Sequence, residues 1–175
     1  MEAAVTQTLD ISERSTLVPA QTFRDGMSRV GAAVHIITTG GAAGRAGFTA
    51  TAVASVADDP PTVLVCLNRN GRSGAVLAEN GVFCVNTLAA EHQALADVFA
   101  GRGGIGGEER FLHGTWEHLA TGAPVLSGAL VAFDCRVVDL RPVATHQILI
   151  GQVEAIRLGP ARPGLLYANR AYHGL

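Results

Sequence analysis

The pattern of hydrophobic and polar positions predicts a protein built mainly from strands. Residues 34–39, 62–67 and 81–88 are short apolar runs rich in β-branched residues, as is typical of buried strands. Residues 129–140 alternate between apolar and polar positions, so this segment is predicted to be a strand with one face toward the core. A further strand is predicted over residues 47–53, joined to the first run by a glycine-rich hairpin turn.

The last long strand is predicted over residues 146–158, and its alternation slips at Gly151. A glycine at such a slip indicates a β-bulge. Residues 101–107 are predicted to form a flexible loop, and residues 116–126 are irregular in pattern. Helical patterns are few and short, and they cover residues 22–32, 73–79 and 92–100. Ser73 is predicted to cap the second of these helices.

The predicted strands do not alternate regularly with helices. This pattern favours a mainly β, antiparallel barrel with a few short peripheral helices over a doubly wound sheet. The chain length of 175 residues suggests one folded domain. We expect residues 1–20 to be a loose N-terminal arm and residues 21–175 to form that domain.

Composition narrows the range of partners. The formal net charge is −2, without acidic or basic blocks, which argues against nucleic acid or an anionic membrane as the main partner. No apolar run reaches the ~18 residues of a transmembrane helix. The first residues are polar and lack the basic-then-apolar order of a signal peptide, so a cytoplasmic location is predicted.

Cysteine and lysine usage excludes several chemistries. Cys66, Cys84 and Cys135 are far apart, which favours reduced, buried thiols and gives a metal site little support. All 13 basic residues are Arg, so Schiff-base chemistry and a P-loop lysine are excluded. Arginine remains available as a bidentate clamp for phosphate.

A run of small side chains between Thr49 and Ser55 is the most informative local feature. Such a strand lets a flat ligand lie against the backbone, where N–H and C=O groups can bond to the edges of a ring. Residues 68–73 then offer Asn, Arg, a glycine turn and a hydroxyl before a helix, which suits a phosphate. A flavin fits both features. The alternative is a hairpin whose small residues pack beneath a helix.

Two other motifs have weaker support. The segment "GRGGIG", residues 101–106, matches a dinucleotide-binding motif in letters, but it follows a helix rather than a strand. A mobile loop near a ligand is the preferred interpretation. Among six histidines, His146 is the candidate for function because it begins the bulged strand, whereas His113 and His118 are expected at the surface.

Seven sequence blocks together resemble the short-chain NAD(P)H:flavin oxidoreductases, which are the reductase components of two-component flavin monooxygenases, such as the 4-hydroxyphenylacetate 3-monooxygenase reductase. The resemblance spans roughly Phe23 to Leu175. The blocks occur in this order: "FRDGMSRVGAAVHIITT", "GFTATAVASVADDPPTVLVCLN", "NGVFCVNTL", "LADVFAG", "APVLSGALVAFDCRV", "THQILIGQV" and "LLYANRAYH".

The resemblance implies an FMN-binding split β-barrel of Greek-key type that forms a homodimer. It implies FMN or FAD as the flavin and NADH or NADPH as the donor, with hydride passing from nicotinamide C4 to flavin N5. Reduced flavin would then serve a partner monooxygenase. Two alternatives remain open: a retained flavin that reduces a cobalamin or a ferric complex, and a non-enzymatic flavin-binding module. A pyridoxamine phosphate oxidase is disfavoured by the block order.

The resemblance also implies roles for individual residues. Those expected to form the wall against the isoalloxazine ring are Thr49, Ala50, Thr51, Ala52, Val53 and Ser55. Those expected at the phosphate seat are Asn70, Arg72, Ser73 and Gly74, with Asn86 close by. Those expected to border the flavin or contact the nicotinamide are Phe99, Gly101, His146, Tyr172 and His173. His146 is the one expected to take part in catalysis, although Ala144 and Thr145 replace the Gly-Asp that precedes it in many members.

Overall fold

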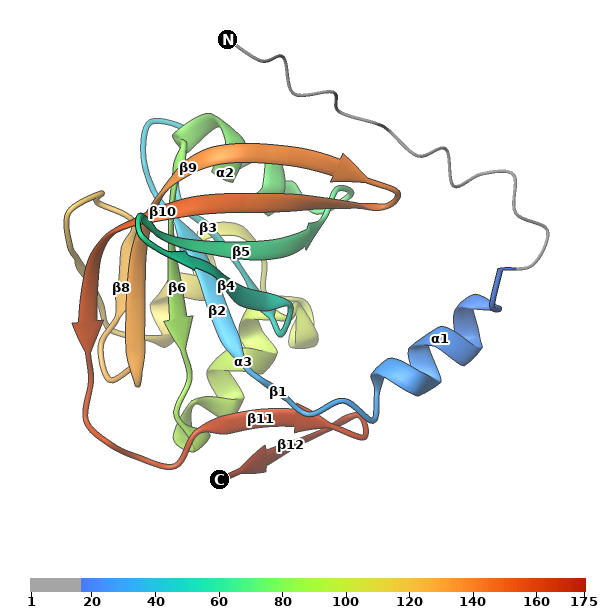
Figure 1. The fold of residues 1–175 in the computed structure, drawn as a ribbon. Helices are drawn as coiled ribbons and strands as arrows, with labels where there is room; N and C mark the ends of the chain where they lie inside the picture. Colours follow the sequence, from blue (N-terminus) through green and yellow to red (C-terminus); the bar gives the residue numbers. More distant parts are fainter. Residues whose placement is uncertain (1–16) are drawn as a thin grey trace, which may run out of the picture.

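The computed structural model describes residues 17–175, and most of this chain belongs to one curled antiparallel sheet (Figure 1). The sheet has seven strands in the order β3-β2-β6-β9-β10-β5-β4. Their bounds are β2 His35–Thr39, β3 Ala46–Ala50, β4 Val53–Asp58, β5 Pro61–Asn68, β6 Val82–Thr87, β9 Val131–Val143 and β10 His146–Leu158. The predicted arm over residues 1–20 falls largely outside the described residues, so the domain division stays a prediction.

The two edge strands of this sheet, β3 and β4, are neighbours in sequence. Only Thr51 and Ala52 separate them, although five strands lie between them in the sheet. The sheet must therefore curl until its edges approach each other, as in a barrel. No hydrogen-bonded ladder joins β3 to β4 among the described residues, so the barrel is split at this seam. The predicted mainly β, antiparallel fold class is confirmed.

Two small sheets and a few short helices complete the fold. The sheets comprise β1 Ala32–Ala33, β11 Leu165–Ala168 and β12 Ala171–Gly174, and the pair β7 Trp116–His118 and β8 Pro124–Leu126. The helices are α1 Ala20–Met27, α2 Arg72–Asn80 and α3 Gln93–Phe99, with the 3₁₀ turns η1 Ala90–His92, η2 Arg102–Gly104 and η3 Gly107–His113. None of the described helices has both the length and the apolar character needed to span a membrane.

Three local predictions need correction. The strand predicted over residues 47–53 ends at Ala50, because the chain must leave one sheet edge there and join the other. Residues 116–126 are not irregular throughout, since they contain β7 and β8. Ser73 does not cap α2: Gly71 holds that position, and the Ser73 hydroxyl instead donates to the Gly47 carbonyl at 3.2 Å.

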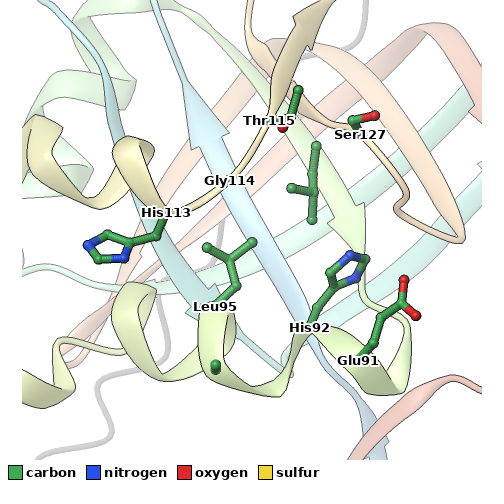
Figure 2. Close-up of a pocket in the computed structure, with 9 residues that line it drawn as sticks. Glu91, His92, Leu95, His113, Gly114, Thr115 and Ser127 are labelled. Carbon is green, nitrogen blue, oxygen red and sulfur yellow. The ribbon is translucent and has the colours of Figure 1, made fainter.

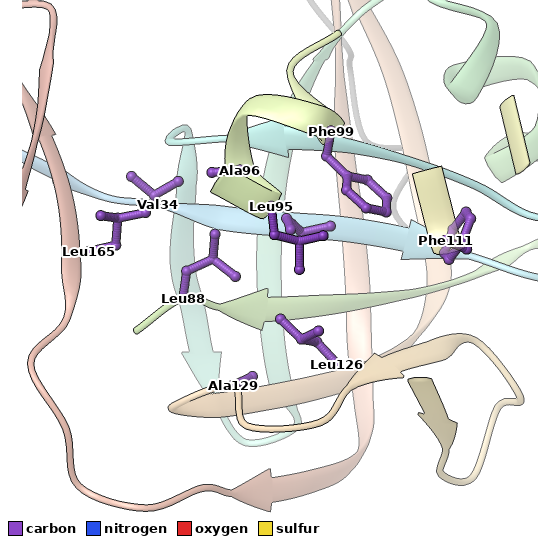
Figure 3. Packing of buried hydrophobic residues seen from close by; sticks show 10 residues of the cluster. Val34, Leu88, Leu95, Ala96, Phe99, Phe111, Leu126, Ala129 and Leu165 are labelled. Atoms are coloured by element: carbon purple, nitrogen blue, oxygen red, sulfur yellow. The ribbon is translucent and has the colours of Figure 1, made fainter. Parts of the chain in front are cut away.

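Apolar side chains form two main clusters, one on each face of β2. One cluster fills the inside of the curled sheet around Ile37, Phe83 and Leu149. The other lies outside the sheet, where α3 packs Leu95 and Phe99 over β2 (Figure 3). α3 is thereby held against the sheet, and its C-terminal end lies next to β3.

The bulge predicted at Gly151 is confirmed. The register of β10 against β9 shifts between Ile150 and Gly151, and Val138 is the extra residue. A Cβ atom on Gly151 would lie 2.3 Å from the ring of Phe83, inside the sheet. Glycine is therefore required here for space as well as for the bend.

Gly151→Ala is expected to lower the free energy of unfolding by about 1–3 kcal/mol, since the Phe83 ring cannot move without disturbing the core. Chemical denaturation would measure this loss. The matched control is Gly26→Ala in α1, where a Cβ would meet nothing within 4 Å, and it should be neutral or slightly stabilising. Equal stability of the two variants would contradict the crowding argument.

His35 is a buried titratable group at the start of β2, the strand next to the β3 edge. Its Nδ1 lies 3.1 Å from the Thr87 hydroxyl. Burial lowers the pKa of His35 from 6.5 to about 4. The folded protein therefore keeps His35 neutral at pH values where the unfolded chain protonates it.

The stability contributed by neutral His35 is present above pH 6.5 and is lost as the pH falls toward 4. We expect a loss of up to about 3 kcal/mol over this range. Denaturant unfolding of the wild type and His35→Asn at several pH values would test it, because the difference between the two curves isolates this side chain. Parallel curves would contradict the prediction.

Candidate functional site

A large cavity of about 850 Å³ lies along the free edge of β3. Its walls are residues 43–52, the end of β5, the start of α2, the end of α3 and the start of η3. These segments are distant in sequence, and the curl of the sheet brings them together. A cavity of this size suits a cofactor-sized ligand.

The β3 wall combines small side chains with accessible backbone groups. The Gly47 carbonyl points to the free edge of the strand, where it accepts hydrogen bonds from the Ser73 hydroxyl and from Arg110 Nη1. Because backbone directions alternate along an antiparallel strand, the Thr49 N–H lies on the same edge. The Thr49 hydroxyl donates to the Ala96 carbonyl at 2.6 Å, which ties α3 to this wall.

The first turn of α2 faces the cavity. Its N-cap, Gly71, has no side chain to bond the first N–H groups, and the first turn carries no acidic residue. A Cβ on Gly74 would lie 2.7 Å from the Leu67 side chain, so the glycine lets the helix approach β5 closely. The start of α2 therefore offers N–H groups and a positive dipole end to an anion.

The cavity carries excess positive charge. It is lined by Arg45, Arg72 and Arg110, with Glu108 as an acidic neighbour. Arg45 Nη2 pairs with Glu108 at 3.7 Å, and its guanidinium lies over the Phe111 ring. Neither Arg72 nor Arg110 has an ion-pair partner anywhere in residues 17–175.

His146 stands at the rim of the cavity, at the start of β10 and opposite Asn68 of β5. Its Nδ1 lies 2.9 Å from the Thr145 hydroxyl. Ala144, two residues before His146, has a φ of 49°, a left-handed conformation in which glycine is less strained. The imidazole is exposed and can reach a bound molecule.

The structure brings many of the residues predicted for the site to this cavity. Those that line it are Thr49, Ala50, Thr51, Ala52, Arg72, Ser73, Gly74, Phe99 and His146. Those that do not line it in the single chain are Val53, Ser55, Asn70, Asn86, Gly101, Tyr172 and His173. Asn70 and Gly101 directly precede or follow lining residues.

Asn86 has a structural position, in contrast to its predicted place at the phosphate seat. It is fully buried, and its amide donates to the Ile36 carbonyl and the Thr38 hydroxyl while accepting from the Leu126 N–H. Both the N–H₂ group and the carbonyl oxygen of its amide therefore have hydrogen-bond partners within the core. Its polarity serves to join β6, β2 and β8.

Tyr172 and His173 belong to the C-terminal hairpin. Tyr172 packs edge-on against Tyr167 at 5.2 Å, and the Arg102 guanidinium lies 5.7 Å from its ring. Burial, together with the nearby Asp97 carboxylate, raises the pKa of Tyr172. His173 Nε2 lies 3.1 Å from the Ala168 carbonyl. The predicted contact of this pair with nicotinamide stays a prediction.

A second, smaller cavity of about 300 Å³ lies beyond the first turn of α3, between η1 and Ser127 (Figure 2). The Ala89 N–H donates to Nδ1 of His92, so the neutral ring carries its proton on Nε2. Burial lowers the pKa of His92. This cavity has no unpaired arginine in its lining, and it is too small to rival the first as a cofactor site.

No group of three or more His, Cys, Asp or Glu side chains gathers in the part of the chain that the structure describes. Cys84 and Cys135 are buried, and burial raises the pKa of the Cys135 thiol to about 12. Cys66 is partly exposed and lines the large cavity, where its side chain is one more small group of the wall.

Sequence reasoning missed the side chains that η3 contributes, above all Arg110. The only sequence signal was general: without lysine, every arginine is a candidate for an anion. Nothing in the local pattern of residues 107–113 distinguishes Arg110, because its position at the cavity depends on contacts with β3 and α3.

A wall of small residues, an uncapped helix start and two arginines that lack an ion-pair partner within residues 17–175 would suit a flat molecule with an anionic tail. The chain belongs to the family described as flavin reductase like domain, whose model matches residues 27–175. The family predicted from the seven sequence blocks is confirmed.

Individual relatives agree with this family. The chain is 49% identical over 173 residues to the FMN reductase (NADH) RutF of Ancylobacter novellus, covering 99% of this chain and 94% of that one. It resembles the structure of BorF, the flavin reductase component of a bacterial two-component tryptophan halogenase, with a TM-score of 0.83, 30% identity and coverage of 90% and 98%. It also resembles the NADH:FAD oxidoreductase SgcE6 of Streptomyces globisporus, with a TM-score of 0.81, 27% identity and coverage of 91% and 97%.

Proposed function

We propose that the protein is an NADH-dependent flavin reductase that takes FMN in the large cavity. One observation carries the proposal: the wall of small residues on β3 lies beside an uncapped helix start and two unpaired guanidinium groups in one cavity. A flavin has the matching shape, a flat ring joined to a phosphate. The relatives named FMN reductase (NADH) support the choice of FMN and NADH.

The chain's own residues would mainly bind and orient. Ala50 and Ala52 leave room for a ring against the strand, and the free β3 edge offers N–H groups where negative charge develops on the ring. The flavin supplies the N5 atom that accepts a hydride from nicotinamide C4. Stacking two rings and excluding water accounts for most of the protein's task, so no side chain need act as a base.

His146 is proposed to steer the nicotinamide or its phosphates from the cavity rim. Its exposed position suits contact with a second ligand that enters after the first. Because its Thr145 neighbour replaces an acidic residue common in the family, this rim is less negative than in those members. That change favours binding of a negatively charged dinucleotide here.

The proposal predicts that the purified protein oxidises NADH when flavin is added, followed by absorbance at 340 nm. FMN, FAD and riboflavin should be compared, with NADPH as the alternative donor. Strong stimulation by free FMN would support flavin as a substrate. Oxidation without added flavin would indicate a retained cofactor and another acceptor, such as a cobalamin or a ferric complex. Bound flavin that NADH does not bleach would indicate a binding module.

We further propose that the protein forms a homodimer through α1 and the β4 edge. α1 stands away from the barrel and has no buried residue (Figure 1). Its apolar side chains at Phe23 and Met27 are 64% and 50% exposed, and Val56 of β4 is 50% exposed. An eight-residue helix with a bare apolar face needs a partner surface, and so does an open edge strand.

Phe23→Asp is expected to weaken the dimer roughly a hundredfold or more, because two copies of a buried phenyl group are lost per dimer. Sedimentation equilibrium over a range of concentrations would measure this. Leu112→Asp on η3, also a highly exposed apolar residue, serves as the control and should leave the association unchanged. A wild type that stays monomeric would contradict the proposal.

We also propose a cellular role for the reduced flavin. Reduced flavin released from the cavity would serve a flavin-dependent monooxygenase in the cytoplasm. Support comes from relatives such as BorF, named as a component of a two-component halogenase. Oxygenation by a candidate monooxygenase that depends on adding this protein and NADH would test it, and oxygenation unaffected by its omission would count against it.

A further inference from the structure

Arg110 joins three walls of the large cavity through backbone carbonyls. Its Nε donates to the Ile105 carbonyl at 3.0 Å, and its Nη1 donates to the carbonyls of Gly47 at 3.1 Å and Phe99 at 3.2 Å. These acceptors belong to the loop before η3, to β3 and to α3. The plane of the guanidinium is thereby held in one orientation.

One nitrogen of this group is left over. Nη2 of Arg110 has no acceptor among residues 17–175 and lies beside Gly101, where a Cβ would stand 3.3 Å from it. The three carbonyls are neutral, so the positive charge of a half-buried side chain stays without a counter-ion. A fixed cation with a spare donor at a cavity wall is suited to an anionic ligand.

The position of the Arg110 guanidinium along β3 indicates which part of a ligand it would contact. The Gly47 carbonyl accepts from both Arg110 Nη1 and the Ser73 hydroxyl, so the guanidinium lies next to the first turn of α2. The small residues that can face a ring, Ala50 to Ala52, lie at the other end of the strand. A flavin placed along β3 therefore has its phosphate, rather than its ring, at Arg110.

We propose that Arg110 is a binding residue for the flavin phosphate, acting through Nη2 together with the start of α2. The inference rests on the proposed function, since it assigns a ligand group within the same cavity. A Cβ on Gly101 would lie 3.3 Å from Nη2, so the glycine leaves this nitrogen uncrowded.

The experiment compares FMN with riboflavin, which lacks the phosphate, by quenching of flavin fluorescence in wild type and Arg110→Gln. We expect FMN affinity to fall about 10- to 100-fold, as for loss of a charge-assisted hydrogen bond, and riboflavin affinity to change less than threefold. Arg102→Gln is the matched control. It removes the same charge from the neighbouring loop, where Arg102 is paired with Asp97, and should spare both ligands.

Other outcomes would overturn the inference. Equal weakening of FMN and riboflavin would reduce Arg110 to a positioning residue that holds the walls, and unchanged FMN affinity would remove it from the site. Should Arg110→Gln fail to fold by circular dichroism, Arg110→Lys decides, with an expected loss of FMN affinity of about three- to tenfold and none for riboflavin. A wild type that binds neither flavin would contradict the proposed function itself, before any variant is compared.

Discussion

The arrangement of this molecule depends on the two-residue connection between β3 and β4. Two residues are enough for a tight hairpin turn, but β3 and β4 do not pair, and Thr51 and Ala52 are too few to cross a flat sheet of seven strands. The sheet must curl instead, and the seam between its edges stays open. β3 is consequently an edge strand with free backbone groups, yet α2 and α3 cover its flanks. An exposed edge that would otherwise invite aggregation becomes one wall of the large cavity.

The Gly47 carbonyl connects two other parts of the cavity wall. It accepts one hydrogen bond from the Ser73 hydroxyl of α2 and another from the Arg110 guanidinium of η3. One backbone oxygen therefore positions both the helix start and the arginine along the strand. Gly47 itself must lack a side chain, because a Cβ would lie 2.7 Å from the Phe99 ring. One short stretch of β3 backbone therefore determines both the shape of the site and the position of its positive charge. Both depend on the absence of a side chain at Gly47.

Features that depend on local pattern could be predicted from the sequence. Strand periodicity identified β2, β6 and β9, the phase slip identified the bulge at Gly151, and the small residues after Gly47 identified the wall. Features that depend on distant contacts could not. A polar Asn86 next to buried strands is compatible with a ligand or with the core, and only the contacts with β2 and β8 decide. Arg110 was missed because its three acceptors are 5 to 63 residues away in sequence.

The strand order also determines when the site can form during synthesis. β4 and β5 join the rest of the sheet only through β10, which pairs with β5 on one side and β9 on the other. A nascent chain that has not yet exposed β10 to the outside of the ribosome holds β4 and β5 as an isolated hairpin, which is marginal in water. The cavity, whose walls include the end of β5, therefore forms only after β10 has been synthesised.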